Sequence, residues 1–187
     1  MEISDDLRLI TRFKDGDLSV FEELVVKYQD RIYNLCRYML RNAHDAEDAA
    51  QDVFFKAYRN LRDFKPEASF YTWLYRIGIN TCLDYRRKSA SASSFLESLS
   101  RGMTSPSDES LFDTTPEKLY ELNEKTKSVE FGLAKMPEKL RAVIILREIE
   151  HLTYEEIAEV LNSSIGTVKS RISRAREMLR EILIKKV

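Results

Sequence analysis

Two amphipathic helical patterns separated by a short polar turn occupy the last quarter of the chain, and they restrict the possible folds more than any other feature. Thr153 and Glu156 have the spacing of a capping box, which gives the first helix a defined start. Its apolar face ends before residues 162–164, where Asn-Ser-Ser breaks the pattern. Ser163 is the expected N-cap of the second helix. Apolar residues recur there at helical spacing: Ile165, Val168, Ile172, Ala175, Leu179 and Ile182.

The second of these helices is strongly cationic. From Ser164 onward, seven Lys and Arg residues against two Glu residues leave a local charge of +5. A helix-turn-helix with a cationic second helix has the geometry that enters the major groove of DNA. The alternative interpretation is a solvated helical hairpin whose arginines only keep the protein soluble.

The composition indicates a helical protein with divided charge. A chain of 187 residues suits one medium domain or two small ones, and 33% charged residues with five Gly and four Pro favour helices. The formal net charge is −1, so the chain as a whole is not basic. Residues 45–52, however, hold four carboxylates and no Lys or Arg. This asymmetry predicts two surfaces for two kinds of partner.

Several classes of site and location are disfavoured by the sequence. Cys36 and Cys82 lie in helical patterns without metal-ligand spacing, so we expect two core thiols in a reducing cytoplasm and no metal. The acidic first residues do not resemble a signal peptide, and no apolar run approaches the ~18 residues of a spanning helix. We therefore expect a cytoplasmic protein without membrane insertion. Because neither a nucleophile–base set nor a Gly-rich phosphate loop occurs, we expect no cofactor and no enzyme activity.

The apolar pattern divides the chain into two helical domains. Helices are expected over residues 6–14, 21–39, 45–61 with Asp45 as N-cap, and 69–88, which together form a domain over residues 1–90. Residues 91–115 are rich in Ser, contain Gly102 and Pro106, and are predicted to form a flexible linker. The alternative is a folded loop packed on one domain. Residues 116–187 form the second domain, a compact four-helix unit.

One stripe of the helix that begins near Asp45 combines charge with an aromatic ring. Asp48, Asp52, Phe55 and Arg59 share this stripe, away from the alanine-rich face of the helix. An apolar anchor surrounded by charge is typical of a protein interface. The alternative is an ordinary solvated helix with one exposed Phe.

The helix over residues 70–88 interleaves aromatic and cationic side chains. Trp73, Leu74 and Ile77 are expected to pack inward, whereas Tyr71, Tyr75 and Tyr85 present their rings elsewhere. Rings that stack on bases, next to cations that neutralise phosphates, bind single-stranded nucleic acid. Asn80 can read a base edge. The cations on this helix are Arg76, Arg86, Arg87 and Lys88. The alternative is that the aromatic rings belong to the core and Asn80 caps a neighbouring turn.

Three features follow one another along the chain: the acidic helix, the aromatic and basic helix, and the helix-turn-helix. This combination resembles the group IV, or extracytoplasmic-function, sigma factors of bacterial RNA polymerase, and sigma-E-like members in particular. The resemblance covers nearly the whole chain apart from the linker. The matching segments are DAEDAAQDVF at residues 45–54, FYTWLYRI at 70–77 with Asn80, Asp84 and Arg87, LREI at 146–149, LTYEEIA at 152–158, GTVKSRI at 166–172 and RARE at 174–177.

The resemblance implies an all-α fold of two small domains, a sigma region 2 helical bundle and a sigma region 4 helix-turn-helix, joined by the flexible linker. It implies a promoter-specificity subunit that initiates transcription of a stress- or signal-responsive gene set. Partners would be core RNA polymerase, through the β′ coiled coil and the β flap, promoter DNA in duplex and single-stranded form, and an anti-sigma factor. The competing hypothesis is a two-domain helix-turn-helix regulator that is not a polymerase subunit.

The resemblance also implies roles for individual residues. Core polymerase would be bound by the acidic stripe: Asp48, Gln51, Asp52 and Phe55. The minus-ten element would be bound by the aromatic and basic helix together with the loop over residues 63–69: Tyr75, Arg76, Asn80, Arg86 and Arg87. The minus-thirty-five element would be bound in the second domain: Arg147, Lys169, Ser170, Ser173 and Arg174. Arg171 and Arg176 would meet phosphates or internal acids.

Overall fold

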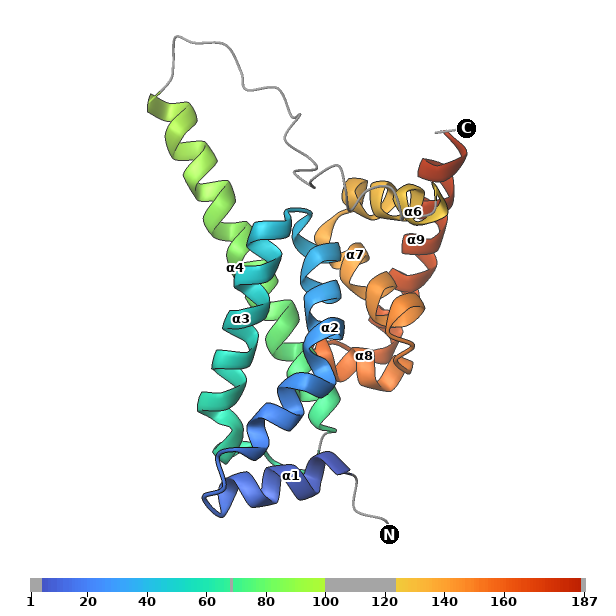
Figure 1. Ribbon diagram of the computed structural model, residues 1–187. Helices are drawn as coiled ribbons and strands as arrows, with labels where there is room; N and C mark the ends of the chain where they lie inside the picture. Colours follow the sequence, from blue (N-terminus) through green and yellow to red (C-terminus); the bar gives the residue numbers. More distant parts are fainter. Residues whose placement is uncertain (1–4, 68, 100–123, 186–187) are drawn as a thin grey trace.

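The computed structural model describes residues 5–67, 69–99 and 124–185, and all regular structure within these ranges is helical (Figure 1). The all-α prediction is confirmed. The helices of the first domain are α1 (Asp5–Lys14), α2 (Val20–Leu40), α3 (Ala43–Asn60), the 3-10 helix η1 (Leu61–Asp63) and α4 (Phe70–Leu99). Those of the second are α6 (Glu124–Lys135), α7 (Glu138–Ile144), the π-helix η2 (Ile145–Ile149), α8 (Tyr154–Val160) and α9 (Ile165–Ile184). Over the described ranges, no helix is both long enough and apolar enough to cross a bilayer.

The first domain is a bundle of α2, α3 and α4, with α1 lying across one end (Figure 1). The interior is filled by large apolar side chains of α2, such as Leu24 and Ile32, against the small alanines of α3, which let the two helices approach closely. Gly78 allows the same for α2 and α4, because a Cβ atom there would lie 2.8 Å from Leu35 Cδ2. The bundle therefore depends on small residues on the faces of α3 and α4.

Two boundaries in the first domain differ from the prediction. Asn42, rather than Asp45, is the N-cap of α3, since Asn42 Oδ1 accepts a hydrogen bond from Asp45 N at 3.1 Å. Asp45 lies inside the first turn. Helix α4 ends at Leu99 instead of near Lys88, because residues 89–99 contain no Gly or Pro to stop it. The helix thus covers the first part of the predicted linker, and residues 100–115 lie outside the described ranges.

The second domain contains the predicted helix-turn-helix, formed by α8 and α9. The capping box is confirmed: Thr153 Oγ1 accepts from Glu156 N at 3.2 Å, and Thr153 N donates to Glu156 Oε2 at 2.7 Å. The N-cap of α9 is Ser164 rather than Ser163, since Ser164 Oγ accepts from Thr167 N at 3.2 Å. The helix starts one residue later than the sequence pattern indicated. Of its predicted apolar face, Val168, Ile172 and Ala175 are buried, Leu179 and Ile182 are half-buried, and Ile165 is exposed.

A wide turn precedes the helix-turn-helix. In η2 and the residues after it, Glu150 N donates to Ile145 O at 3.1 Å and Leu152 N donates to Leu146 O at 3.0 Å. These bonds span five and six residues instead of the four of an α-helix. His151 then adopts a left-handed backbone conformation, with φ of 58°. The chain consequently changes direction between α7 and α8, and Glu150 stands at the corner.

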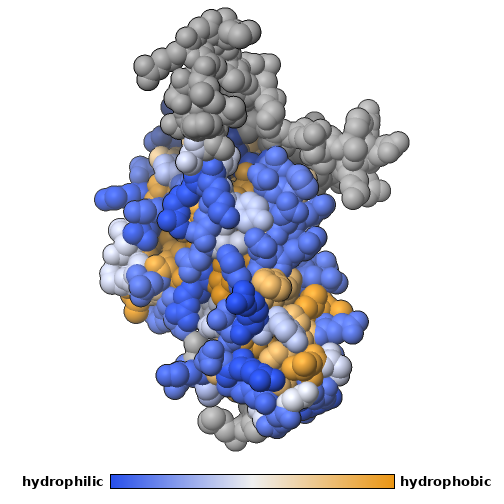
Figure 2. Space-filling model, turned by 90° about the vertical axis from the view of Figure 1, so that its left-hand side faces the viewer, coloured by the Kyte–Doolittle hydropathy of each residue, from blue (hydrophilic) through white to orange (hydrophobic). Residues whose placement is uncertain are grey.

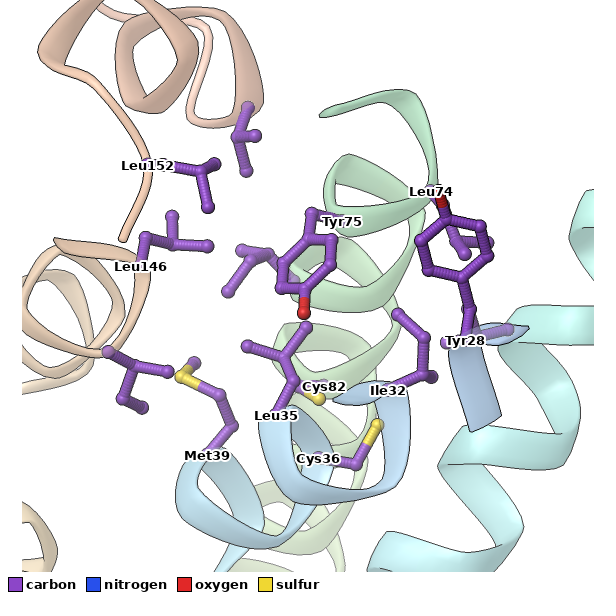
Figure 3. Close-up of a cluster of buried hydrophobic side chains, with 14 of the residues drawn as sticks. Tyr28, Ile32, Leu35, Cys36, Met39, Leu74, Tyr75, Cys82, Leu146 and Leu152 are labelled. Carbon is purple, nitrogen blue, oxygen red and sulfur yellow. The ribbon is translucent and has the colours of Figure 1, made fainter. Parts of the chain in front are cut away.

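The two domains share one hydrophobic core. Buried residues of both domains belong to a single cluster, and α4 packs against α8 while α2 packs against α6 and α7. Figure 3 shows Tyr75 of α4 between the α2 side chains and the second-domain residues Leu146 and Leu152. All three side chains are almost completely buried. The domains are therefore closed against each other.

Candidate protein and nucleic-acid interfaces

The outer face of α9 carries four of the residues that the sequence suggested for duplex DNA. Lys169, Ser170, Ser173 and Arg174 are all exposed, and they occupy two adjacent helical turns opposite the buried residues of α9. Ser170 Oγ donates to Thr167 O at 2.9 Å, which leaves its lone pairs available. Two cations and two hydroxyl groups on one face match the chemistry of phosphates and base edges in a major groove.

Arg147 differs from these four residues because it lies in η2 and is half-buried. Its Nη1 donates to Leu152 O at 2.7 Å, and its guanidinium lies 5.0 Å from the centroid of the Tyr154 ring. Both contacts stabilise the turn that leads into α8. Arg176 also contacts its own domain: Nε and Nη2 bind Glu148 Oε1 at 2.9 and 2.6 Å. This hydrogen bonding raises the pKa of Arg176, so an internal acid is its partner, one of the two expected options.

The acidic stripe of α3 is exposed around an aromatic ring. Phe55 is 60% exposed, and the guanidinium of Arg59 lies 5.6 Å from its ring centroid. Asp48 and Gln51 are exposed, whereas Asp52 is half-buried and accepts a hydrogen bond from Tyr85 of α4 at 3.0 Å. Burial and this contact with Asp52 raise the pKa of Tyr85 to about 12.

The apolar surface near Phe55 is larger than the sequence indicated. Tyr58 of α3 is also exposed, and its ring packs edge-on against Phe13 and Phe21 at 5.3 and 5.1 Å between centroids. Leu18, in the turn before α2, is also exposed. Figure 2 shows the α3 side of the molecule, where apolar residues gather on the lower part of a mostly hydrophilic face.

The α4 residues expected to bind single-stranded nucleic acid are not all accessible. Asn80 and Arg87 are exposed, and Arg87 pairs with Asp84 one turn away. Arg76 is half-buried. Arg86 is also half-buried, and its Nε lies 2.6 Å from Glu138 Oε1 of the second domain.

Tyr75 corrects a sequence-based expectation. We expected its ring to lie away from the core side of α4, but the residue is 0% exposed, as in the alternative of a core ring, and its hydroxyl donates to the Glu150 carboxylate. Its ring lies 4.3 Å from that of Tyr71, and burial, followed by the hydrogen bond to Glu150, raises its pKa strongly. The physical reason is that α8 and the turn before it cover this part of α4. Of the residues expected to pack inward, Leu74 is buried and Trp73 and Ile77 are half-buried.

Comparison with known proteins gives matches to both domains in the same order. Residues 24–92 match Sigma-70 region 2, and residues 128–179 match Sigma-70, region 4. The chain is 40% identical over 177 residues to the ECF RNA polymerase sigma factor SigW of Bacillus subtilis, covering 93% of this chain and 94% of that protein. It is 39% identical over 181 residues to the ECF RNA polymerase sigma-E factor of Escherichia coli, covering 93% and 92%.

A solved structure supports the same assignment. CnrH in complex with the cytosolic domain of CnrY aligns with a TM-score of 0.68 at 26% identity, over 96% of this chain and 97% of CnrH. The family matches fall on α2 to α4 and on α6 to α9, and the sequence relatives extend over nearly the full chain. The chain is therefore a member of the extracytoplasmic-function RNA polymerase sigma factors.

Proposed function

We propose that this sigma factor is the subunit that gives a bacterial core RNA polymerase its promoter specificity, for a stress- or signal-responsive set of genes. The observation that carries the proposal is the combination, in one chain, of an exposed acidic and aromatic stripe on α3 with an exposed cationic recognition face on α9. A protein that only binds DNA has no need of the first surface. The subunit acts in the cytoplasm, has no cofactor and performs no chemistry of its own.

Core polymerase binds the stripe formed by Asp48, Gln51, Asp52 and Phe55, through its β′ coiled coil. Phe55 is the apolar anchor, since an exposed ring gains most from burial in a partner's pocket. The carboxylates around it select a basic partner surface and speed encounter. In the second domain, the β flap provides the other polymerase contact.

The minus-thirty-five element binds α9 as duplex DNA. Arg174 and Lys169 are long enough to reach guanine edges or phosphates, while Ser170 and Ser173 accept or donate at closer range. Arg147 adds a contact from η2, where its Nη1 donates to Leu152 O and its guanidinium fork has five N–H donors in all. A net charge of −1 keeps non-specific DNA affinity low when the subunit is alone, because few counterions are released.

The minus-ten element binds α4 as an opened strand. Asn80 reads a base edge, Tyr75 provides a ring for an extruded base, and Arg76, Arg86 and Arg87 neutralise phosphates, together with the loop over residues 63–69. Tyr75 and Arg86 face the second domain in the closed molecule. The two domains must therefore separate before this site is complete.

An anti-sigma factor is a further partner. Support comes from CnrH, which was solved with the cytosolic domain of CnrY and aligns over 96% of this chain. Such an inhibitor would hold the two domains together and cover both the α3 and the α9 surfaces.

Run-off transcription with purified core polymerase and a promoter library tests the proposal. We expect specific transcripts only when the subunit is added. Stable association with duplex DNA without any transcript would instead indicate a conventional two-domain regulator. The relatives do not favour that alternative, since the match to sigma factors covers 93% of the chain.

A further inference from the structure

A carboxylate of the second domain, that of Glu150, forms hydrogen bonds with two tyrosines of α4. Tyr75 donates its hydroxyl to Glu150, and Tyr71 Oη lies 3.2 Å from both Glu150 Oε2 and Glu150 O. Burial, as the first cause, raises the pKa of Tyr71 to about 12, so both hydroxyls remain donors at neutral pH. A single anionic group from the helix-turn-helix domain is therefore held by two rings of the helix proposed to bind single-stranded DNA.

Other polar contacts hold the same closed arrangement at its opposite end. Arg141 of α7 is 1% exposed, and its acceptors are four backbone carbonyl oxygens. One of them, Met39 O at 2.7 Å, lies in the last turn of α2 of the first domain. The others lie in the last turn of α6 or directly after it, at 2.7 to 3.2 Å: Leu133 O, Ala134 O and Met136 O. Carbonyls at helix C-termini carry partial negative charge, which suits a buried cation.

Two ion pairs also cross between the domains. Arg37 of α2 lies 2.5 Å from Glu130 of α6, and Arg86 of α4 lies 2.6 Å from Glu138 of α7. Arg86 is one of the cations assigned to the minus-ten strand. Two tyrosines and one of the three arginines of the α4 site are thus occupied by acidic residues of the second domain.

We propose that Glu150 and Glu138 act as an internal substitute for single-stranded DNA, so that the closed molecule inhibits its own minus-ten site. This inference rests on the proposed function of α4. Glu150 occupies the tyrosines, where an extruded base would bind, and Glu138 occupies Arg86, where a phosphate would bind. Because the same α4 groups cannot bind both, strand binding and domain closure exclude each other, and anything that separates the domains makes the site available.

The first measurement is the distance between the domains in the full-length protein. Spin labels at Glu47→Cys and Glu177→Cys lie on exposed positions of α3 and α9, while Cys36 and Cys82 are buried in the core. We expect one short distance in the otherwise unchanged chain and a second, longer population in Glu150→Ala. Glu148→Ala is the matched control, since Glu148 pairs with Arg176 inside its own domain.

The second measurement is the affinity for a fluorescent single-stranded DNA of random sequence. We expect Glu150→Ala to bind about five-fold or more tightly than Glu148→Ala, which has the same change in net charge. Adding Tyr75→Ala to Glu150→Ala is expected to remove the gain. Glu138→Ala, which releases Arg86, is expected to increase affinity in the same direction.

Two results would overturn the inference. One is a Glu150→Ala protein that stays closed and binds the strand no better than Glu148→Ala. The other is a Glu150→Ala protein that opens without any gain in strand affinity. Run-off transcription with the unmodified chain separates this failure from failure of the proposed function. If transcripts form but Glu150→Ala does not change strand binding, only the self-inhibition is rejected. If no transcripts form, the proposed function itself is rejected.

Discussion

At the scale of single residues, Arg141 shows how much a buried cation can organise without a carboxylate partner. Burial lowers its pKa to about 10, yet the guanidinium binds carbonyls in the last turns of α2 and α6. We expect Arg141→Ala to reduce the free energy of unfolding by at least about 2 kcal/mol, because it leaves buried carbonyls unsatisfied and opens a cavity. Urea denaturation followed by circular dichroism measures this loss.

Arg8 provides the comparison for Arg141. It forms an ion pair with Asp5 at 3.2 Å, with both side chains 70% exposed, so Arg8→Ala is expected to change stability little. An Arg141→Ala protein as stable as Arg8→Ala would mean that the carbonyls find other donors.

Tyr85 gives a pH-dependent prediction. Its pKa is raised to about 12 from 10.0, because burial and the Asp52 carboxylate both disfavour the phenolate. A raised pKa means that the stabilisation is complete below pH 10 and is lost as the pH rises through about 12. The titration of Tyr85 is the phenolate absorbance of the wild type at each pH minus that of Tyr85→Phe. We expect its midpoint near pH 12, at a pH where circular dichroism still shows intact helices. A midpoint near pH 10 would contradict the Tyr85–Asp52 contact.

Residue positions were predictable where one helix determines them, and not where two domains meet. The exposed face of α9 follows from helical spacing alone, and Lys169 and Arg174 lie where the pattern indicated. Tyr75 does not, because the atoms that bury it belong to residues such as Glu150, which lies 75 positions away. Local periodicity carries no information about such a contact, so the sequence could not assign Glu150, Glu138 or Arg141 to the domain boundary.

At the scale of elements, the helices were predicted well and their ends less well. Cap residues shifted to Asn42 and Ser164 because neighbouring polar residues have similar capping ability. The π-helix at Ile145–Ile149 was not predicted, since its sequence reads as an ordinary apolar helical turn. This element matters for the proposed function, because it positions Arg147 and precedes Glu150.

The contact between α6 and α9 depends on a glycine. A Cβ atom at Gly132 would lie 2.4 Å from Leu179 Cδ1, closer than unstrained atoms approach. We expect Gly132→Val to destabilise the protein by about 1–3 kcal/mol, through overpacking against α9. Thermal or urea unfolding measures the change.

Gly166, in the first turn of α9, is the matched control. A Cβ atom there would meet only Ser164 Oγ at 4.0 Å, so Gly166→Ala is expected to be neutral or to stabilise α9 by up to about 1 kcal/mol. Equal losses for the two variants would show that side-chain crowding is not the cause at Gly132.

At the scale of the whole molecule, three surfaces with different chemistry belong to one nearly neutral chain. The α3 stripe is acidic and aromatic, the α9 face is cationic, and the α4 surface is partly covered by the second domain. Domain contacts made of a few polar groups around a shared apolar core can be replaced by contacts with a larger partner. The closed and the active arrangements therefore need not differ in the structure of either domain.

Separation of the proposed polymerase and DNA surfaces leads to the last prediction, a pair of variants that affect different partners. Phe55→Ala removes the apolar anchor on α3, and we expect it to weaken binding to core polymerase about ten-fold or more. Arg174→Ala removes a cation from α9, and we expect it to cost about 1–3 kcal/mol in binding to the minus-thirty-five duplex selected in run-off transcription. Phe55→Ala should leave the affinity for the duplex unchanged, and Arg174→Ala should leave the affinity for core polymerase unchanged. Fluorescence anisotropy with the full-length protein measures both.

Val26→Ala is the control for Phe55→Ala, because Val26 is an equally exposed apolar residue, at 63%, on α2 instead of the α3 stripe. It should leave core affinity unchanged. For Arg174→Ala, a scrambled duplex separates base reading from phosphate binding, since an equal loss on both duplexes would assign Arg174 to the phosphates. If Phe55→Ala and Val26→Ala bound core polymerase equally well, the α3 stripe would not be the polymerase surface, and the exposed ring would need another partner.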